Sequence, residues 1–168
     1  MKYQEVLNKE NPKIRMIIEE YGEIELELFP GIAPKTVENF LSLIKKGFYD
    51  GLTFHRIIQG FMIQGGDPLG TGMGGSSQTI VGEFDSNGFH NPLEHTRGVI
   101  SMARAYSPNS ASSQFFIMHE NAPHLDGAYA AFGACTKGIE VVDRIAAVAV
   151  DANDRPKAAI RIKKAELI

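Results

Sequence analysis

Arg56 is a cation among apolar neighbours in the segment FHRIIQGFMIQGGD, residues 54–67. A turn at Gln59-Gly60 would fold this segment into a hairpin that places Arg56 opposite Gln64. Because side chains alternate along a strand, Arg56, Met62 and Gln64 would then share one face. A guanidinium beside methionine and phenylalanine fits a binding pocket that holds a few polar groups. The alternative is an arginine whose stem covers apolar surface while its charged head reaches water.

Two further segments favour the binding pocket. The segment SQFFIMHENAPHLDGAYAAFG, residues 113–133, is rich in aromatic and amide groups in strand and loop positions. The segment SMARA, residues 101–105, could form a strand edge whose backbone groups bind an extended peptide. The side chains of the longer segment that could line such a pocket are Gln114, Phe116, Leu125 and Tyr129.

Motifs for other chemistries are weak or absent. Gly70–Gly75 reads GTGMGG and matches the motif GxGxxG. A dinucleotide-binding site needs a helix directly after this motif, but the following SSQTIVGEF is strand-like. We therefore interpret the motif as a plain glycine loop. The five histidines form no HExxH motif and no Cys/His cluster, which favours structural or surface histidines over a metal site. Cys135 has no cationic neighbour in AFGAC and no GxSxG motif is present, so we expect a buried, inert thiol. We therefore expect no metal and no cofactor.

The composition indicates one ordinary globular domain. Its 168 residues are 43% apolar and 22% charged, which suffices for a large core. With 17 basic and 20 acidic residues the net charge is −3, and no basic run exceeds two residues, so we expect no nucleic-acid partner. No apolar stretch approaches the ~18 residues of a membrane span, and the charged N-terminus is unlike a signal peptide. We therefore expect no membrane contact and a cytoplasmic, monomeric protein.

Short strands and two helices account for the hydrophobic pattern. A Tyr21-Gly22 turn joins Arg15–Ile18 to the alternating EIELEL, residues 23–28, in a predicted hairpin whose glutamates face away from the core. Helical spacing predicts one helix that begins near Pro34 and ends before Gly47, with Val37, Phe40, Leu41 and Ile44 on its apolar face, and a second over Ile139–Ala147. The other predicted strands are Phe54–Ile58, Phe61–Gln64, Val99–Ala103, Gln114–Met118, Ala130–Gly133 and Ala159–Leu167.

The arrangement of these elements favours a mainly β fold. Residues 51–88 hold ten of the 17 glycines, which is typical of tight turns and strand corners. Many short strands with only two helices favour a closed antiparallel barrel or a sandwich. Residues 1–12 are polar and lack a period, so we expect an N-terminal extension on the surface of a domain that spans residues 13–168.

The segments around Arg56, Phe116 and Tyr129 together resemble one known family. FHRIIQGFMIQGGD, SMARAYSPNSASSQFFI and HLDGAYAAFG are similar to the cyclophilins, the peptidyl-prolyl cis-trans isomerases, and the resemblance extends over about residues 13–168. The glycine-rich insertion and the acidic, compact chain resemble the bacterial cytoplasmic branch most. The resemblance implies an eight-stranded antiparallel β-barrel closed by two α-helices, with the site on its outer face. It also implies that the substrates are proline-containing peptides and folding proteins.

The resemblance also implies particular catalytic and binding residues. Arg56 matches the catalytic arginine of the family, and Gln64 the glutamine that orients it and meets the substrate. Gly72 falls in the glycine-rich loop beside a neighbouring substrate pocket. The walls of the proline pocket match Phe61, Met62, Phe116 and Leu125. The edge whose backbone binds the peptide matches Ala103 and Arg104, with the Gln114 amide beside it.

Three positions depart from the best-known members. His124 stands where many cyclophilins have tryptophan, Tyr129 where many have histidine, and Arg104 where asparagine is frequent. The family uses mainly backbone groups at Arg104, so these departures bear on substrate preference and drug binding more than on the activity. We expect weak binding of the cyclic peptide cyclosporin.

Two other functions remain open at the level of the sequence. The chain could be a peptide-binding or chaperone module with vestigial catalysis, although loss of Arg56 or Phe116 would be the signal for that and both residues are present. A nucleotide-binding protein rests only on GTGMGG.

Overall fold

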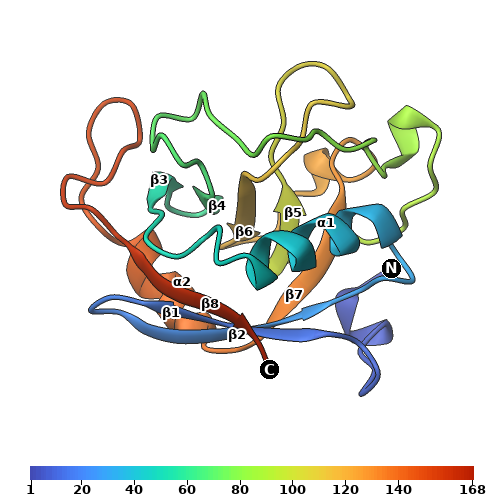
Figure 1. Ribbon diagram of the computed structural model, residues 1–168, viewed down its shortest axis with the longest axis horizontal. Helices are drawn as coiled ribbons and strands as arrows, with labels where there is room; N and C mark the ends of the chain where they lie inside the picture. Colours follow the sequence, from blue (N-terminus) through green and yellow to red (C-terminus); the bar gives the residue numbers. More distant parts are fainter.

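Eight antiparallel strands form one curled sheet in the computed structural model, which describes residues 1–168 (Figure 1). Two α-helices, α1 (Pro34–Lys45) and α2 (Ile139–Ala146), pack against the sheet. Three short 3-10 helices are η1 (Tyr3–Glu5), η2 (Asp85–Asn87) and η3 (Pro123–Leu125). The spatial order of the strands is β3-β4-β6-β5-β7-β2-β1-β8, and their bounds are β1 (Lys13–Ile18), β2 (Gly22–Leu28), β3 (Phe54–Ile58), β4 (Met62–Gly65), β5 (Val99–Met102), β6 (Phe115–Met118), β7 (Ala131–Lys137) and β8 (Ile162–Leu167). The fold is therefore mainly β, as predicted.

The two edge strands of the sheet, β3 and β8, do not form a ladder with each other. One isolated bridge, between Thr53 and Arg161, joins them, flanked by hydrogen bonds such as the one from the Ile162 N–H to the Leu52 carbonyl (2.8 Å). The predicted closed barrel is thus not confirmed, and β8 begins three residues later than the predicted strand. Before β8 the chain forms a loop that pairs with itself through a bridge between Val150 and Pro156, and residues 157–160 are not part of a strand. This stretch contacts β3 through single hydrogen bonds, such as the one from the Phe54 N–H to the Ile160 carbonyl at 2.9 Å.

The β1–β2 hairpin shows one departure from the predicted alternation. The apolar residues of β2 are fully buried as expected, and β1 supplies the antiparallel partners of Ile24 and Leu26. Glu27 was expected on the exposed face, yet it is only 5% exposed. Residues of the N-terminal segment cover it, because Asn8 donates its backbone N–H and Asn11 its side-chain amide to the Glu27 carboxylate, each at 2.9 Å.

Helix α1 begins with a cap that comes from far along the chain. Ala33 at the N-cap position supplies no side-chain hydrogen bond. Instead, the buried Glu83 carboxylate accepts the Lys35 N–H at 3.2 Å and the Thr36 N–H at 2.7 Å. A carboxylate there satisfies free amides and complements the helix dipole, so it stabilises the first turn. After the helix, Gly47 takes the left-handed conformation (φ +70°), as its predicted position past the C-terminus requires.

Strand β6 links the core to the outer face. Phe115 points inward, where it meets Phe40 of α1 edge to face with ring centroids 5.8 Å apart and Tyr49 at 5.4 Å. The Tyr49 hydroxyl donates to the Ser113 carbonyl at 2.8 Å, which fixes the start of the strand. Because side chains alternate along a strand, Phe116 points to the opposite face. The rigid aromatic core therefore holds Phe116 in place on the outer face.

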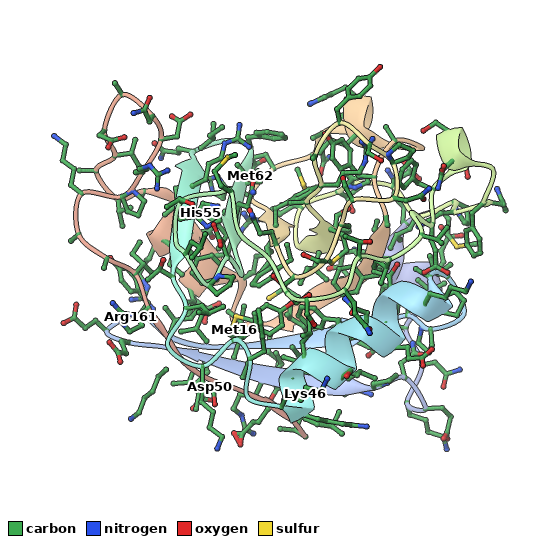
Figure 2. The ribbon with its side chains drawn as sticks, turned by 45° about the horizontal axis from the view of Figure 1, so that its top comes forward. Met16, Lys46, Asp50, His55, Met62 and Arg161 are labelled. Carbon is green, nitrogen blue, oxygen red and sulfur yellow. The ribbon has the colours of Figure 1, made fainter.

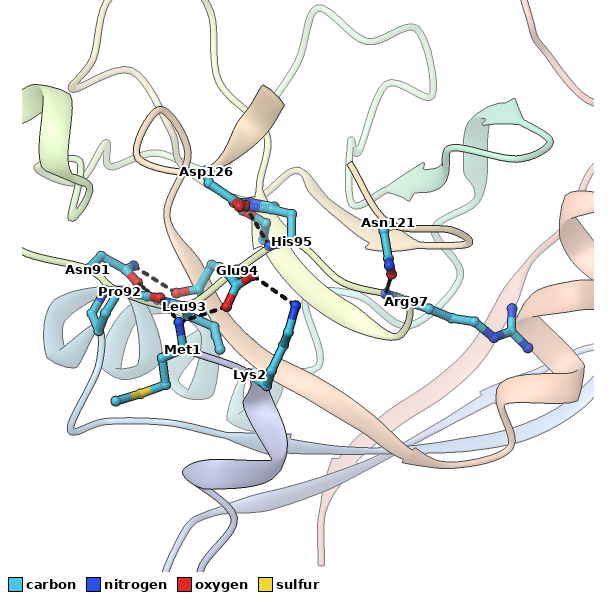
Figure 3. Close-up of polar contacts among 12 residues, drawn as sticks. Met1, Lys2, Asn91, Pro92, Leu93, Glu94, His95, Arg97, Asn121 and Asp126 are labelled. Carbon is cyan, nitrogen blue, oxygen red and sulfur yellow. Dashed lines mark hydrogen bonds and ion pairs between the residues drawn. The ribbon is translucent and has the colours of Figure 1, made fainter. Parts of the chain in front are cut away.

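An irregular segment, residues 91–97, is held by side-chain hydrogen bonds rather than by a ladder (Figure 3). The Glu94 carboxylate accepts from the Lys2 ammonium and from the amino group of Met1, both at 2.8 Å. The Arg97 N–H donates to the Asn121 side chain at 2.8 Å. These bonds attach the N-terminal residues and the loop before η3 to the same segment.

None of the helices is long and apolar enough to cross a membrane.

Candidate active site

An apolar pocket of about 130 Å³ lies on the outer face of the sheet. Its walls come from β3, β4 and β6, from the segment after β5 and from η3 and the chain that follows it. Figure 2 shows Met62 near His55 at the end of the molecule away from Lys46. The structure brings nine of the predicted site residues together here: Arg56, Phe61, Met62, Gln64, Ala103, Arg104, Phe116, Leu125 and Tyr129.

The hairpin that carries Arg56 has the predicted register. Arg56 pairs with Gln64 and Ile58 with Met62, and the turn contains Gly60 at φ +81°. Arg56 Nη1 donates to the Gln64 side-chain oxygen at 3.3 Å. Arg56 is nevertheless exposed, so most of its N–H groups remain free for a ligand at the mouth of the pocket.

A chain of amides continues from Gln64 away from the apolar pocket. Gln64 donates to the Gln114 side-chain oxygen at 3.0 Å, and Gln114 donates to the carbonyls of Gly72 (3.0 Å) and Gly74 (2.8 Å). Gln114 and Gly72 therefore do not line the apolar pocket. They line a neighbouring pocket of about 200 Å³, with Gln64, Ala103 and Arg104 shared between the two.

The glycine loop is organised by Asp67, a residue that the sequence analysis did not single out. Its buried carboxylate accepts the backbone N–H groups of Leu69, Thr71, Gly72 and Gly74 at 2.6–3.2 Å. Burial alone would raise the pKa of Asp67, but these four hydrogen bonds outweigh it and hold the pKa below its ordinary value. No local pattern marks this role, because backbone N–H groups make four of the hydrogen bonds and only the Thr71 hydroxyl adds one from a side chain, at 3.4 Å.

His95 supports the wall of the apolar pocket from behind and was also missed. Its ring stacks on Phe116, with centroids 6.1 Å apart and an interplanar angle of 18°. Nδ1 lies 3.0 Å from the Asp126 carboxylate and Nε2 lies 2.9 Å from the Ser101 hydroxyl, so Nδ1 donates and Nε2 accepts. Burial lowers the pKa of His95 despite the hydrogen bond to Asp126, which keeps the ring neutral. His95 thus ties β5, β6 and the residue after η3 together.

His124 lies outside the lining of the apolar pocket. Its exposed ring packs against Phe61 with centroids 5.7 Å apart and an angle of 34°. Phe61 itself does line the pocket. His124 therefore forms part of the outer rim and touches the pocket through Phe61.

Arg104 combines free backbone groups with a held side chain. The Ala103 N–H is already bound to the Gln114 carbonyl (3.0 Å), but neither the Ala103 carbonyl nor the Arg104 N–H has a partner within the chain. The guanidinium lies over the rings of Phe84 (4.8 Å) and Tyr129 (4.7 Å) and donates to the Ala128 carbonyl at 2.7 Å. The side chain therefore stiffens this edge, while the Ala103 carbonyl and the Arg104 N–H stay free to bind a ligand.

Cys135 is buried, and burial raises the pKa of its thiol to about 12. A thiol with such a pKa stays protonated at neutral pH and is a poor nucleophile. It lies outside the apolar pocket. No group of three or more His, Cys, Asp or Glu side chains is arranged to hold a metal ion.

Comparisons with known proteins agree on one family. A profile described as cyclophilin type peptidyl-prolyl cis-trans isomerase/CLD matches residues 13–167. "Peptidyl-prolyl cis-trans isomerase-like 1" of Neurospora crassa is 49% identical over 148 residues, which cover 88% of this chain and 89% of the relative. "Peptidyl-prolyl cis-trans isomerase B" of Bacillus subtilis is 50% identical over 124 residues, 74% of this chain and 83% of the relative. The fungal and the bacterial relative are thus about equally similar in sequence to this chain.

A solved structure has the same fold. The crystal structure of a cyclophilin type peptidyl-prolyl cis-trans isomerase from Cryptosporidium parvum superimposes with a TM-score of 0.86 at 36% identity and covers 94% of this chain and 98% of that chain. A second structure of that protein, determined in the presence of the dipeptide Ala-Pro, superimposes with a TM-score of 0.85 at 37% identity.

Proposed function

The chain belongs to the cyclophilin-type peptidyl-prolyl cis-trans isomerases, and from this premise we propose how its outer-face pocket accelerates rotation about X–Pro bonds. The observation that carries the proposal is the position of Arg56, an exposed guanidinium at the mouth of an apolar pocket. An X–Pro bond isomerises over tens to hundreds of seconds, so turnover in milliseconds requires about 10⁴–10⁵-fold acceleration, roughly 6–7 kcal/mol. Because no covalent bond is broken, binding and electrostatics can supply this acceleration.

The apolar walls provide the first contribution. We propose that Phe61, Met62, Phe116 and Leu125 hold the proline ring, which brings the prolyl amide out of water. The planar amide owes its rotation barrier to a charge-separated resonance form. Water stabilises that form, so a less polar environment lowers the barrier.

Arg56 provides the second contribution. The prolyl nitrogen is a poor hydrogen-bond acceptor while its lone pair is conjugated, and it becomes a good acceptor when the bond twists. A hydrogen bond from Arg56 to this nitrogen therefore strengthens only in the transition state. The bond to Gln64 at 3.3 Å leaves other guanidinium N–H groups free and supports the orientation of the side chain.

The free backbone groups after β5 provide an anchor. We propose that the Ala103 carbonyl and the Arg104 N–H bind the residues that precede the proline while the other side of the bond rotates. Extended peptides bind sheet edges through such backbone pairs. The Cryptosporidium parvum structure determined with Ala-Pro supports a proline-containing peptide as the substrate. Folding proteins would present the same group, and a monomeric, cytoplasmic enzyme remains our prediction.

Exchange spectroscopy by NMR on a short X–Pro peptide tests the activity directly. We expect catalytic amounts of the protein to bring cis–trans exchange into the millisecond range, and we expect the same rate after treatment with excess EDTA. The reason is that neither proposed contribution uses a metal. Loss of activity on chelation would contradict the metal-free mechanism. Binding of the peptide without faster exchange would identify a peptide-binding module instead.

His124→Trp tests the rim of the pocket with cyclosporin as the ligand. Histidine covers less apolar area than tryptophan, and its N–H lies at a different place, so we expect the native protein to bind cyclosporin weakly. A larger rim aromatic should contribute about 1–2 kcal/mol to binding of a large apolar ligand, so the variant should bind cyclosporin about tenfold more tightly. Turnover should change little, because His124 lies outside the pocket lining.

Titration with cyclosporin measures the affinity of the native protein and of the variant, and an assay on one X–Pro peptide measures their turnover. His90→Trp is the matched control, because the His90 side chain is 82% exposed and does not line the pocket. An unchanged Kd for His124→Trp would contradict the rim argument. A change in turnover as large as the change in affinity would instead place His124 in the catalytic machinery.

A further inference from the structure

A third pocket, of about 270 Å³ and wholly polar, adjoins the apolar pocket. Arg56 and Gln64 line both pockets, and the polar one is completed by residues of β3, the glycine loop and the loop before β8. No apolar side chain lines it. The lining residues that matter here, besides Arg56 and Gln64, are His55, Thr71, Asn153 and Arg155. The mechanism proposed above leaves this pocket without a role.

His55 contributes an unsatisfied polar group to this pocket. The residue is only 6% exposed, and neither ring nitrogen has a hydrogen-bond partner within the chain. A buried donor without a partner costs on the order of 1–3 kcal/mol, so such groups usually indicate an absent partner. Burial lowers the pKa of His55, more than the nearby Asp67 carboxylate raises it, and the neutral ring therefore keeps one N–H to donate.

Two guanidinium groups make the pocket positively charged. Arg155 donates to the carbonyls of Gly70 (2.9 Å) and Thr71 (2.6 Å), which uses two of the five N–H groups of a guanidinium and fixes its position against the glycine loop. Arg56 makes one side-chain hydrogen bond, to Gln64. The nearby Asp67 carboxylate is already engaged by backbone N–H groups of the loop. The pocket therefore offers free donors and positive charge.

We propose that this pocket binds the carboxylate of an acidic side chain in the same peptide whose proline occupies the apolar pocket. The inference rests on the proposed function, because it assigns a second contact to the same substrate. A carboxylate accepts several hydrogen bonds and matches the planar fork of an arginine. Its oxygens would accept hydrogen bonds from the N–H groups of Arg155 and His55. Because Arg56 lines both the polar and the apolar pocket, this contact would lie next to the rotating bond.

Paired peptides that differ only in Glu or Gln at one position test the proposal. In each pair, Glu is replaced by Gln at a single position, and four pairs cover the two positions before the proline and the two positions after it. At one of these positions we expect kcat/KM for the Glu peptide to exceed that for the Gln peptide about five- to tenfold, because the pair is partly exposed and screened. No preference for Glu at any position would overturn the proposal. Failure to isomerise the Gln peptides would instead contradict the proposed function itself.

Variants in the loop before β8 test whether the preference for Glu depends on the charge of Arg155 or on the structure of the loop. Arg155→Gln should reduce the Glu/Gln ratio to near one, whereas Arg155→Lys keeps the charge but loses the fork and should retain only part of the preference. Lys157→Gln makes the same charge change on an exposed side chain outside the pocket and should leave the ratio unchanged. Asn153→Asp places a repelling carboxylate in the pocket without removing a side-chain hydrogen bond, and it should lower the ratio below the native value. A native ratio in Arg155→Gln or in Asn153→Asp would overturn the assignment.

Discussion

Arg56→Ala should lower kcat/KM for an X–Pro peptide by about 100- to 1,000-fold, the range observed when one preorganised transition-state donor is removed. The loss should fall mainly on kcat, because the proposed hydrogen bond to the prolyl nitrogen forms only as the bond twists. The apolar walls remain, so the affinity for the peptide should change little. Exchange rates by NMR at several peptide concentrations separate the two effects.

Arg56→Lys distinguishes charge from geometry at the same position. The ammonium keeps the charge but lacks the planar fork that binds Gln64 and substrate together, so we expect this variant to remain poor. Arg144→Ala, at an exposed position on α2 outside the pocket, is the control for loss of an arginine. If affinity and turnover fell equally in both Arg56 variants, Arg56 would be a ground-state binding residue.

Gly66→Ala should lower the free energy of unfolding by about 3–5 kcal/mol, since it combines backbone strain with overpacking. Gly66 follows β4 directly and has φ +89°, a conformation that residues with a side chain rarely adopt. An added Cβ would lie 2.6 Å from the Ser113 carbonyl oxygen and 3.0 Å from the rings of Phe115 and Tyr49. Because two of these neighbours belong to the aromatic core and one is backbone, none can move away cheaply.

Gly60→Ala is the matched control for this prediction. Gly60 also has a positive φ (+81°), but nothing lies within 4 Å of an added Cβ. Only the backbone strain remains there, so we expect a loss of about 1 kcal/mol. Urea unfolding of both variants measures the difference. Similar losses at the two positions would show that strain, and not the contact with the core, dominates at Gly66.

Local patterns predicted the parts of the site that belong to one hairpin. The turn at Gln59-Gly60 determines the register of its two strands, so Arg56 could be placed opposite Gln64 from the sequence alone. The aromatic and amide composition of residues 113–133 suggested that Phe116, Leu125 and Tyr129 could line the same pocket. Their roles came from the family resemblance, since composition and periodicity do not specify which strands become neighbours. The structure has β4 beside β6, which are separated by about a third of the chain.

The missed residues act over long sequence separations. Glu83 caps a helix that begins with Pro34, and His95 bonds to Ser101 and Asp126 on different segments. Periodicity reports which face of an element is apolar, but it carries no information about such partners. The same limit explains the error at Glu27, which the alternating pattern placed in solvent and the N-terminal segment covers.

The single carboxylate that holds the glycine loop has a consequence for how this enzyme could diversify. Asp67 binds main-chain amides, so the shape of the loop does not depend on the side chains of Leu69 and Met73, which are 67% and 87% exposed. Gly74 is constrained, since an added Cβ would lie within 2.8 Å of Leu69 as well as against Asp67. Mutational drift can therefore sample new side chains at position 73 without a penalty in folding. This position lines the pocket of about 200 Å³ that adjoins the proline pocket. Preference for particular client sequences can evolve there while Arg56 and the proline pocket stay fixed.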